Sequence, residues 1–175
     1  GMIAELGLFA LILALLLAIA QGTLPLIGAA RGDVALMAVG RSAAFGQLFF
    51  VGLAYAALTY AFVTDDFSLR YVATHSNSLL PTQYKISGVW GGHEGSLLLW
   101  VLILSVWSAA VATFSRSLPR DVLARVLGVM GLVAIGFIGF TLFTSSPFER
   151  LVPAALEGRD LNPMLRDPHG AMGHI

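Results

Sequence analysis

The pair of side chains best suited to chemistry is His93 and Glu94, which stand next to each other in the stretch VWGGHEGSLLLW, residues 89–100. An imidazole and a carboxylate are the usual groups for acid–base chemistry and for metal binding. A zinc-protease helix would need a second histidine three residues after the glutamate, but Leu97 stands there. The stretch also lacks the G-x-S-x-G pattern of a nucleophile elbow. These two hydrolytic chemistries are therefore excluded for this motif.

Aromatic residues around this pair recur at helical spacing. On a helix that extends back to Trp90, His93 and Trp100 would lie on one stripe, because residues three and four apart share a face. The full series is Trp90, His93, Leu97, Trp100, Leu104 and Trp107. One interpretation is a packing seam with tryptophan at the membrane interface. The other is a wall for a large flat hydrophobic ligand such as a porphyrin.

Glu94 falls in the first turn of the expected helix, where unpaired N–H groups and the helix dipole favour a carboxylate. A capping role is therefore one interpretation. The other is functional, because an ionisable pair close to a membrane is costly without partners. Gly91, Gly92 and Gly95 would relax the backbone at this entry and leave room for a neighbour.

Composition indicates the class of protein. The 175 residues are 57% hydrophobic and only 11% charged, with a mean hydropathy of +0.83, which indicates a membrane protein. The formal net charge is zero, so the chain has no basic footprint for nucleic acid. It has no cysteine, which excludes a disulfide, a thiolate nucleophile and a cysteine-based metal site.

Four apolar segments are long enough to cross a bilayer as helices, which takes about 20 residues each. We therefore expect an all-α polytopic membrane protein with a four-span unit at 1–144 and a tail at 145–175. Gln21, Gly22 and Pro25 are expected to kink or loosen the end of the first span. The expected spans are 6–30, 42–63, 94–114 and 122–143.

Basic residues predict the orientation of these spans. The short connections at 31–41 and 115–121 are dense in arginine, whereas the long connection 64–93 holds only Arg70 and Lys85. The rule that cytoplasmic loops are positively charged then predicts an N-out, C-out topology. The loop 64–93, the tail and all four histidines would lie on the outer face.

The motif at residues 90–107, WGGHEGSLLLWVLILSVW, resembles the signature of the CcmF family of cytochrome c-type biogenesis proteins, which are haem lyase subunits of the bacterial inner membrane. Three other stretches resemble that family in the same order: ARGD, TDDFSLRYVATHSNSLLPTQYK and LFTSSPFERLVPAALEGRDLNPMLRDP. The resemblance extends to about Pro168 and fits the N-terminal portion of the family. A related haem lyase subunit associated with nitrite reductase shares the pattern.

The resemblance implies a function that is larger than this chain. Family members attach haem to apocytochrome c on the periplasmic side, through the thiols of a C-x-x-C-H motif. The implied partners are a CcmE-like haem chaperone, apocytochrome c with a CcmH-like presenting subunit, the remaining part of the same lyase, and membrane lipid. The family's tryptophan-rich WWD segment, which handles haem, would lie beyond residue 175. The resemblance makes Trp90, Gly91, Gly92, His93, Glu94 and Trp100 candidates to shape a haem-handling surface.

The end of the chain departs from the family. The family continues with G-L-x-x-H-P-P, whose histidine is a haem ligand, whereas this chain reads RDPHGAMGHI. His174 is one residue late for that ligand, and His169 stands at a position where the family has glycine. None of the four spans holds a histidine, so we expect no haem within them. The alternatives are a structural scaffold subunit that does not contact haem, and a haem transporter module.

Overall fold

The computed structural model describes residues 2–64, 66, 69–75 and 81–149, except for the side chains of residues 87 and 90. This part of the chain forms six helices and contains no strand. The helices are α1 (Met2–Arg31), α2 (Val34–Val63), α3 (Arg70–His75), α4 (Thr82–Gly91), α5 (His93–Phe114) and α6 (Arg120–Thr144). By length and composition, α1, α2, α5 and α6 can each cross a membrane, which confirms the all-α, four-span prediction.

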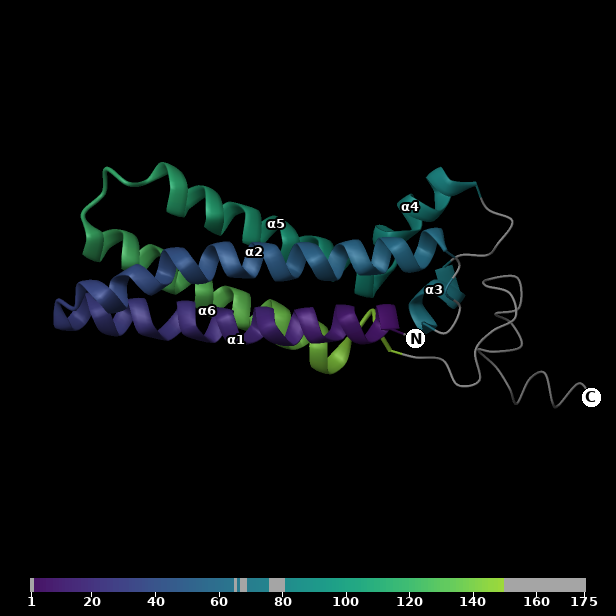
Figure 1. Cartoon of the computed structure of the whole chain (residues 1–175), viewed down its shortest axis with the longest axis horizontal. Helices are drawn as coiled ribbons and strands as arrows, with labels where there is room; N and C mark the ends of the chain where they lie inside the picture. Colours follow the sequence, from purple (N-terminus) through teal and green to yellow (C-terminus); the bar gives the residue numbers. More distant parts are fainter. Residues whose placement is uncertain (1, 65, 67–68, 76–80, 150–175) are drawn as a thin grey trace, which may run out of the picture.

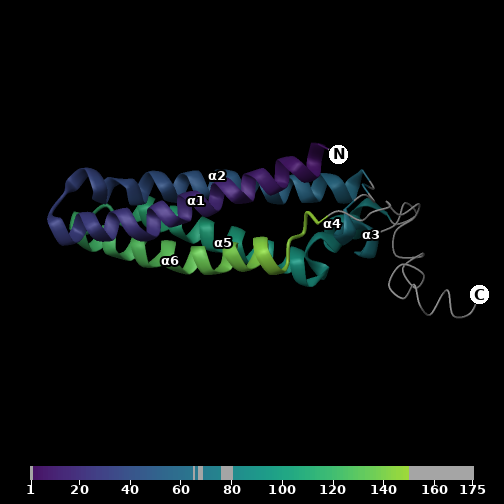
Figure 2. The same ribbon diagram turned by 90° about the horizontal axis from the view of Figure 1, so that it is seen from below.

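The four long helices run side by side along the long axis of the molecule (Figures 1 and 2). The short helices α3 and α4 lie at one end, together with the start of α1 (Figure 1). We call this the α3–α4 end. The connections 32–33 and 115–119 lie at the opposite end, which we call the short-connection end. Large apolar side chains such as Phe49, Trp107 and Phe143 point outward, as expected for helices that face lipid.

The turn between α1 and α2 is shorter than the predicted connection at 31–41. Gly32 adopts a positive φ of 70°, which glycine tolerates without steric cost. Asp33 then caps α2, because its Oδ1 accepts the backbone N–H groups of Ala35 at 3.0 Å and Leu36 at 3.2 Å. Hydropathy locates the apolar part of a helix, whereas this cap sets its actual start at Val34.

Helix α1 continues through Pro25 as far as Arg31, although a kinked or loosened end was predicted there. Gln21 is fully buried and joins three helices. Its Nε2 donates to the carbonyl oxygen of Leu127 in α6 at 2.7 Å, and its Oε1 accepts the Nε2 of Gln47 in α2. Polar groups inside an apolar bundle need such partners. Gln21 is therefore a packing residue between helices.

The glycines of α6 fall into two groups. A Cβ atom on Gly131 would lie 2.5 Å from the backbone nitrogen of Gly22 in α1, so these two backbones touch. Close backbone approach at small residues is how membrane helices pack tightly. By contrast, Gly136 and Gly139 face open space. Only the first half of α6 therefore uses glycine for helix packing.

Candidate functional site

The α3–α4 end contains a sharp joint between α4 and α5. Helix α4 ends at Gly91, Gly92 is extended with φ −105° and ψ 173°, and α5 begins at His93. Trp90 therefore belongs to α4, and the predicted single helical stripe from Trp90 to Trp107 is wrong. The part of the stripe that starts at His93 lies on α5.

Tyr71 of α3 holds this joint together. Its side chain is buried, with 3% exposure. Its hydroxyl donates to the carbonyl oxygen of Val89 at 2.8 Å and accepts the backbone N–H of Gly92 at 2.9 Å. The hydroxyl thus satisfies the last turn of α4 and the residue that separates α4 from α5. Both partners of the hydroxyl are backbone groups, so these bonds hold α4 and the start of α5 in place independently of the side chains at residues 89 and 92.

Burial raises the pKa of Tyr71 to about 12, because the phenolate would be poorly solvated. Hydrogen bonds from the backbone of Gly92 and Gly95 lower the pKa, and the charge of Glu94 raises it further. Tyr71 is therefore neutral at physiological pH, and it retains the proton that it donates to Val89.

Two glycines of the motif are required by this joint. A Cβ on Gly95 would collide with the carbonyl oxygen of Val89 and with the Tyr71 hydroxyl. A Cβ on Gly92 would lie 2.5 Å from His75 Nε2 and 2.7 Å from Tyr71 Cε1. Gly91 faces open space. Close packing against α3 explains Gly92, and close packing against Val89 of α4 and Tyr71 of α3 explains Gly95, whereas nothing in the structure explains Gly91.

His75 completes the inner layer of the joint. Its ring centroid lies 4.4 Å from that of Tyr71. Its Nδ1 lies 3.0 Å from the carbonyl oxygen of Tyr71 and 2.8 Å from the hydroxyl of Thr74. These contacts hold the ring in place while Nε2 faces Gly92. Neither Tyr71 nor His75 was predicted as a site residue, although the family-like segment 64–85 contains both.

His93 lies at the first position of α5 and faces the end of α6. Its Nε2 lies 3.1 Å from Ser145 Oγ, and its ring packs edge-on against Phe140, with centroids 6.4 Å apart. The imidazole is exposed. Glu94 is half-buried and occupies the first turn of α5, as expected. Trp100, with 60% exposure, points out of the bundle.

An open apolar groove begins beside His93. Its volume is about 430 Å³, and Phe140 belongs both to the groove and to the surroundings of His93. The lining residues are Leu97, Leu132, Val133, Gly136, Phe137 and Phe140. An exposed imidazole at the head of an apolar groove can take a flat apolar ligand with a polar or metal-bearing centre. Within the described ranges, no three histidine, aspartate or glutamate residues cluster to hold a metal ion.

The candidates are thus brought together only in part. Gly91, Gly92, His93 and Glu94 are adjacent at the joint, whereas Trp100 lies about 10 Å further along α5, at 1.5 Å per residue. The backbone of Trp90 lies in α4. His169 and His174 lie outside the described residues, so the ligand prediction for His174 stays a prediction.

The four helices that are long and apolar enough to cross a membrane define a polytopic membrane protein. Residues 90–175 match the family model described as Cytochrome C assembly protein. A solved structure of "Cytochrome c Heme Lyase CcmF" aligns with a TM-score of 0.78 and 28% identity, over 84% of this chain and 25% of that one. The chain belongs to the cytochrome c assembly protein family.

Curated relatives support the same assignment. The cytochrome c-type biogenesis protein CcmF of Pseudomonas aeruginosa is 58% identical over 95% of this chain and 25% of its own length. The CcmF of Escherichia coli is 50% identical over 95% of this chain and 26% of its own. The NrfE protein of Haemophilus influenzae is 45% identical over the same shares. The chain thus spans about a quarter of the length of these relatives.

Proposed function

We propose that this chain is part of a membrane haem lyase that attaches haem covalently to apocytochrome c during cytochrome c maturation. The observation that carries the proposal is the identity of 45–58% with cytochrome c-type biogenesis proteins along 95% of the chain. The solved relative is named a haem lyase. The chain supplies a portion of such an enzyme, and it acts together with the remaining part of the same lyase.

The portion acts in the bacterial inner membrane with its α3–α4 end in the periplasm. Five arginines and two aspartates lie in residues 31–41 and 115–125, at the short-connection end. This excess of positive charge supports a cytoplasmic location for that end. The α3–α4 end then faces the compartment in which a CcmE-like chaperone delivers haem and a CcmH-like subunit presents apocytochrome c.

The chemistry of the side chains at the α3–α4 end suits contact with the edge of a haem group. An imidazole nitrogen is a common haem ligand, and apolar side chains suit a porphyrin ring. His93 and the ring of Phe140 beside it, at the ends of the spans, offer these two features. When bound, haem supplies the vinyl groups to which the apoprotein thiols add. The chain's own contribution is to present His93 and Glu94 at the joint and Trp100 further along α5, and His174 is a candidate ligand outside the described residues.

A scaffold role without haem contact is the second candidate function. The close contact between Gly22 and Gly131 and the buried bridge of Gln21 and Gln47 favour it, because both make a rigid bundle. A visible absorption spectrum of the purified chain in detergent discriminates between the two. A stoichiometric Soret band would contradict the scaffold role. A haem transporter module would need polar residues along the spans that are free to bind a substrate. The buried Gln21 and Gln47 already bond to each other, and Gln21 also bonds to Leu127.

Deleting the gene and staining membrane and periplasmic proteins for covalent haem tests the proposed function. We expect c-type cytochromes to lose the stain and a plasmid-borne copy to restore it. Undiminished covalent haem in the deletion strain would contradict the proposal. Immunoblots for the apocytochromes exclude a loss of synthesis as the cause.

A further inference from the structure

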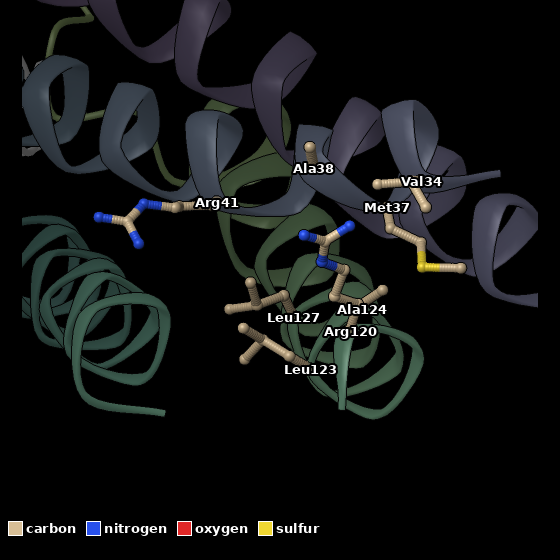
Figure 3. Close-up of a pocket in the computed structure, with 8 residues that line it drawn as sticks. All are labelled: Val34, Met37, Ala38, Arg41, Arg120, Leu123, Ala124 and Leu127. Atoms are coloured by element: carbon tan, nitrogen blue, oxygen red, sulfur yellow. The ribbon is translucent and has the colours of Figure 1, made fainter. Parts of the chain in front are cut away.

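A second hollow lies at the short-connection end, between α2 and α6, far from the joint. Its volume is about 320 Å³, at the lower end of the usual range for ligand pockets. Each helix contributes residues at the same spacing of 0, 3, 4 and 7, so one face of each helix forms a wall. The lining residues are Val34, Met37, Ala38 and Arg41 of α2 and Arg120, Leu123, Ala124 and Leu127 of α6 (Figure 3).

The hollow has the shape of a wedge. At its inner end the helices are in contact, because a Cβ on Gly40 would lie 3.3 Å from Leu127 Cβ, and Leu127 is only 1% exposed. At its outer end Val34 is 48% exposed. The wedge is therefore closed at one end by the contact of Gly40 with Leu127, beside Arg41, and exposed at the other end beside Val34.

Two arginines border this apolar wedge. The guanidinium of Arg120 is directed toward α2, beside Ala38 (Figure 3), and no hydrogen bond or ion pair joins it to the described part of the chain. Arg41 lies over the ring of Phe45, 5.3 Å from its centroid, with Nη1 3.5 Å from the carbonyl oxygen of Ala112. Neither arginine has a carboxylate partner among the described residues.

The two aspartates near this end are already engaged. Asp33 caps α2, and Asp121 pairs with Arg125 at 3.0 Å. The positive charge beside the wedge is therefore uncompensated. A further helix packed over the wedge would desolvate two guanidiniums, which is unfavourable unless that helix brings negative charge. An occupant with an anionic head and an apolar body matches both halves of the site.

We propose that this wedge is a binding site for an anionic phospholipid. Its phosphate binds Arg120, Arg41 adds positive charge from its place over Phe45, and an acyl chain lies along Met37, Leu123 and Leu127. Arginine binds phosphate oxygens through its fork of N–H donors, and basic pockets between membrane helices bind anionic headgroups. The stem of Arg120 lines the apolar part while its charged end can reach the headgroup layer, whereas the guanidinium of Arg41 lies over Phe45, one turn deeper along α2. The site is independent of the proposed haem lyase activity.

Native mass spectrometry of the protein expressed from its complete gene tests the proposal. The protein is stripped of lipid in detergent and titrated with phosphatidylglycerol or with phosphatidylcholine of the same acyl chains. We expect one saturable phosphatidylglycerol, and weaker binding of phosphatidylcholine. Arg120→Gln and Arg41→Gln should each weaken phosphatidylglycerol binding about five-fold. Arg116→Gln, an exposed arginine at the same end but outside the wedge, is the matched control and should bind as the wild type does.

Ala38→Phe separates the apolar half of the site from the charged half. Ala38 is exposed and lines the wedge, so phenylalanine should fill the space without disturbing the bundle, and phosphatidylglycerol binding should fall. Unchanged binding in both Arg120→Gln and Ala38→Phe would overturn the proposal, as would equal affinity for the two lipids. A wild type that binds no phosphatidylglycerol would also overturn it and would indicate that another segment covers the wedge.

Discussion

The hydroxyl of Tyr71 accepts the backbone N–H of Gly92 at 2.9 Å, and so α3 is tied to the break between α4 and α5. The same hydroxyl donates to Val89 at 2.8 Å. One side chain thereby sets the direction in which α5 enters the membrane. His93 and Glu94, the first two residues of α5, take their positions from this contact rather than from bonds of their own to α3.

Gly95→Ala should disrupt the joint. The new methyl group would meet the backbone oxygen of Val89, which has no rotamer to move away. Overpacking of this kind costs about 1–3 kcal/mol. We expect a lower melting temperature in detergent and less mature protein in the membrane. Gly91→Ala is the matched control in open space, and a loss in Gly91→Ala equal to that in Gly95→Ala would contradict the packing explanation.

Tyr71→Phe keeps the ring but removes both hydrogen bonds to the joint. We expect a loss of about 1 kcal/mol per bond in the free energy of unfolding. Tyr84→Phe, an exposed tyrosine in α4, should show no loss. A Tyr71→Phe variant as stable as the wild type would contradict the role of this hydroxyl.

The pKa of Tyr71 predicts a pH dependence. The folded pKa of about 12 lies above the usual 10.0, so the folded state retains a proton that the unfolded state loses. The stability from this group is fully present below pH 10 and is lost as the pH rises through about 12. The stability difference between wild type and Tyr71→Phe should shrink over that window. A difference that stays constant across the window would contradict the raised pKa.

Gly131→Ala should loosen the contact between α1 and α6, because its Cβ would meet the backbone of Gly22. Gly136→Ala places the same methyl group on the same helix in open space. We expect Gly131→Ala to lower stability by about 1–3 kcal/mol, and Gly136→Ala to be neutral or slightly stabilising, since alanine favours helix. Thermal unfolding of both variants in one detergent provides the comparison.

The buried glutamines should be energetically coupled. Gln21→Leu removes the partner of Gln47 and leaves a buried amide without its acceptor. In membrane proteins such coupling averages about 0.6 kcal/mol and reaches about 1.7. A double-mutant cycle with Gln21→Leu and Gln47→Leu should give a value in this range. Purely additive effects would show that the bridge is absent in the membrane.

The four spans could be predicted from the sequence because each is a long apolar run, and that signal depends only on the chain and the thickness of the bilayer. Helix α2 starts at Val34, before the expected span at 42–63, because Asp33 caps it and the residues up to Gly40 continue the helix. Helix α1 runs from Met2 to Arg31 with the buried Pro25 inside it, so its end is helical, and the predicted kink at Pro25 stays a prediction.

The joint could not be predicted in the same way. The spacing of Trp90, His93 and Leu97 favours one continuous helix, and only the contact of Gly92 with Tyr71 and His75 explains the break. That contact joins residues that are distant in sequence, so the periodic spacing of neighbouring residues cannot predict it. Glu94 was placed correctly in a first turn, because a helix start is a local feature.

The effect of replacing His93 and Glu94 on cytochrome c maturation tests the proposed function most directly. A His93→Ala/Glu94→Gln variant of the full-length protein is expressed in the deletion strain, with Thr82→Ala, an exposed residue at the same end, as the control. Immunoblots confirm equal amounts in the membrane, and haem staining measures holocytochrome c. We expect a clear loss of covalent haem in the double variant and wild-type yield in the control. Wild-type yield in the double variant would contradict the proposed function.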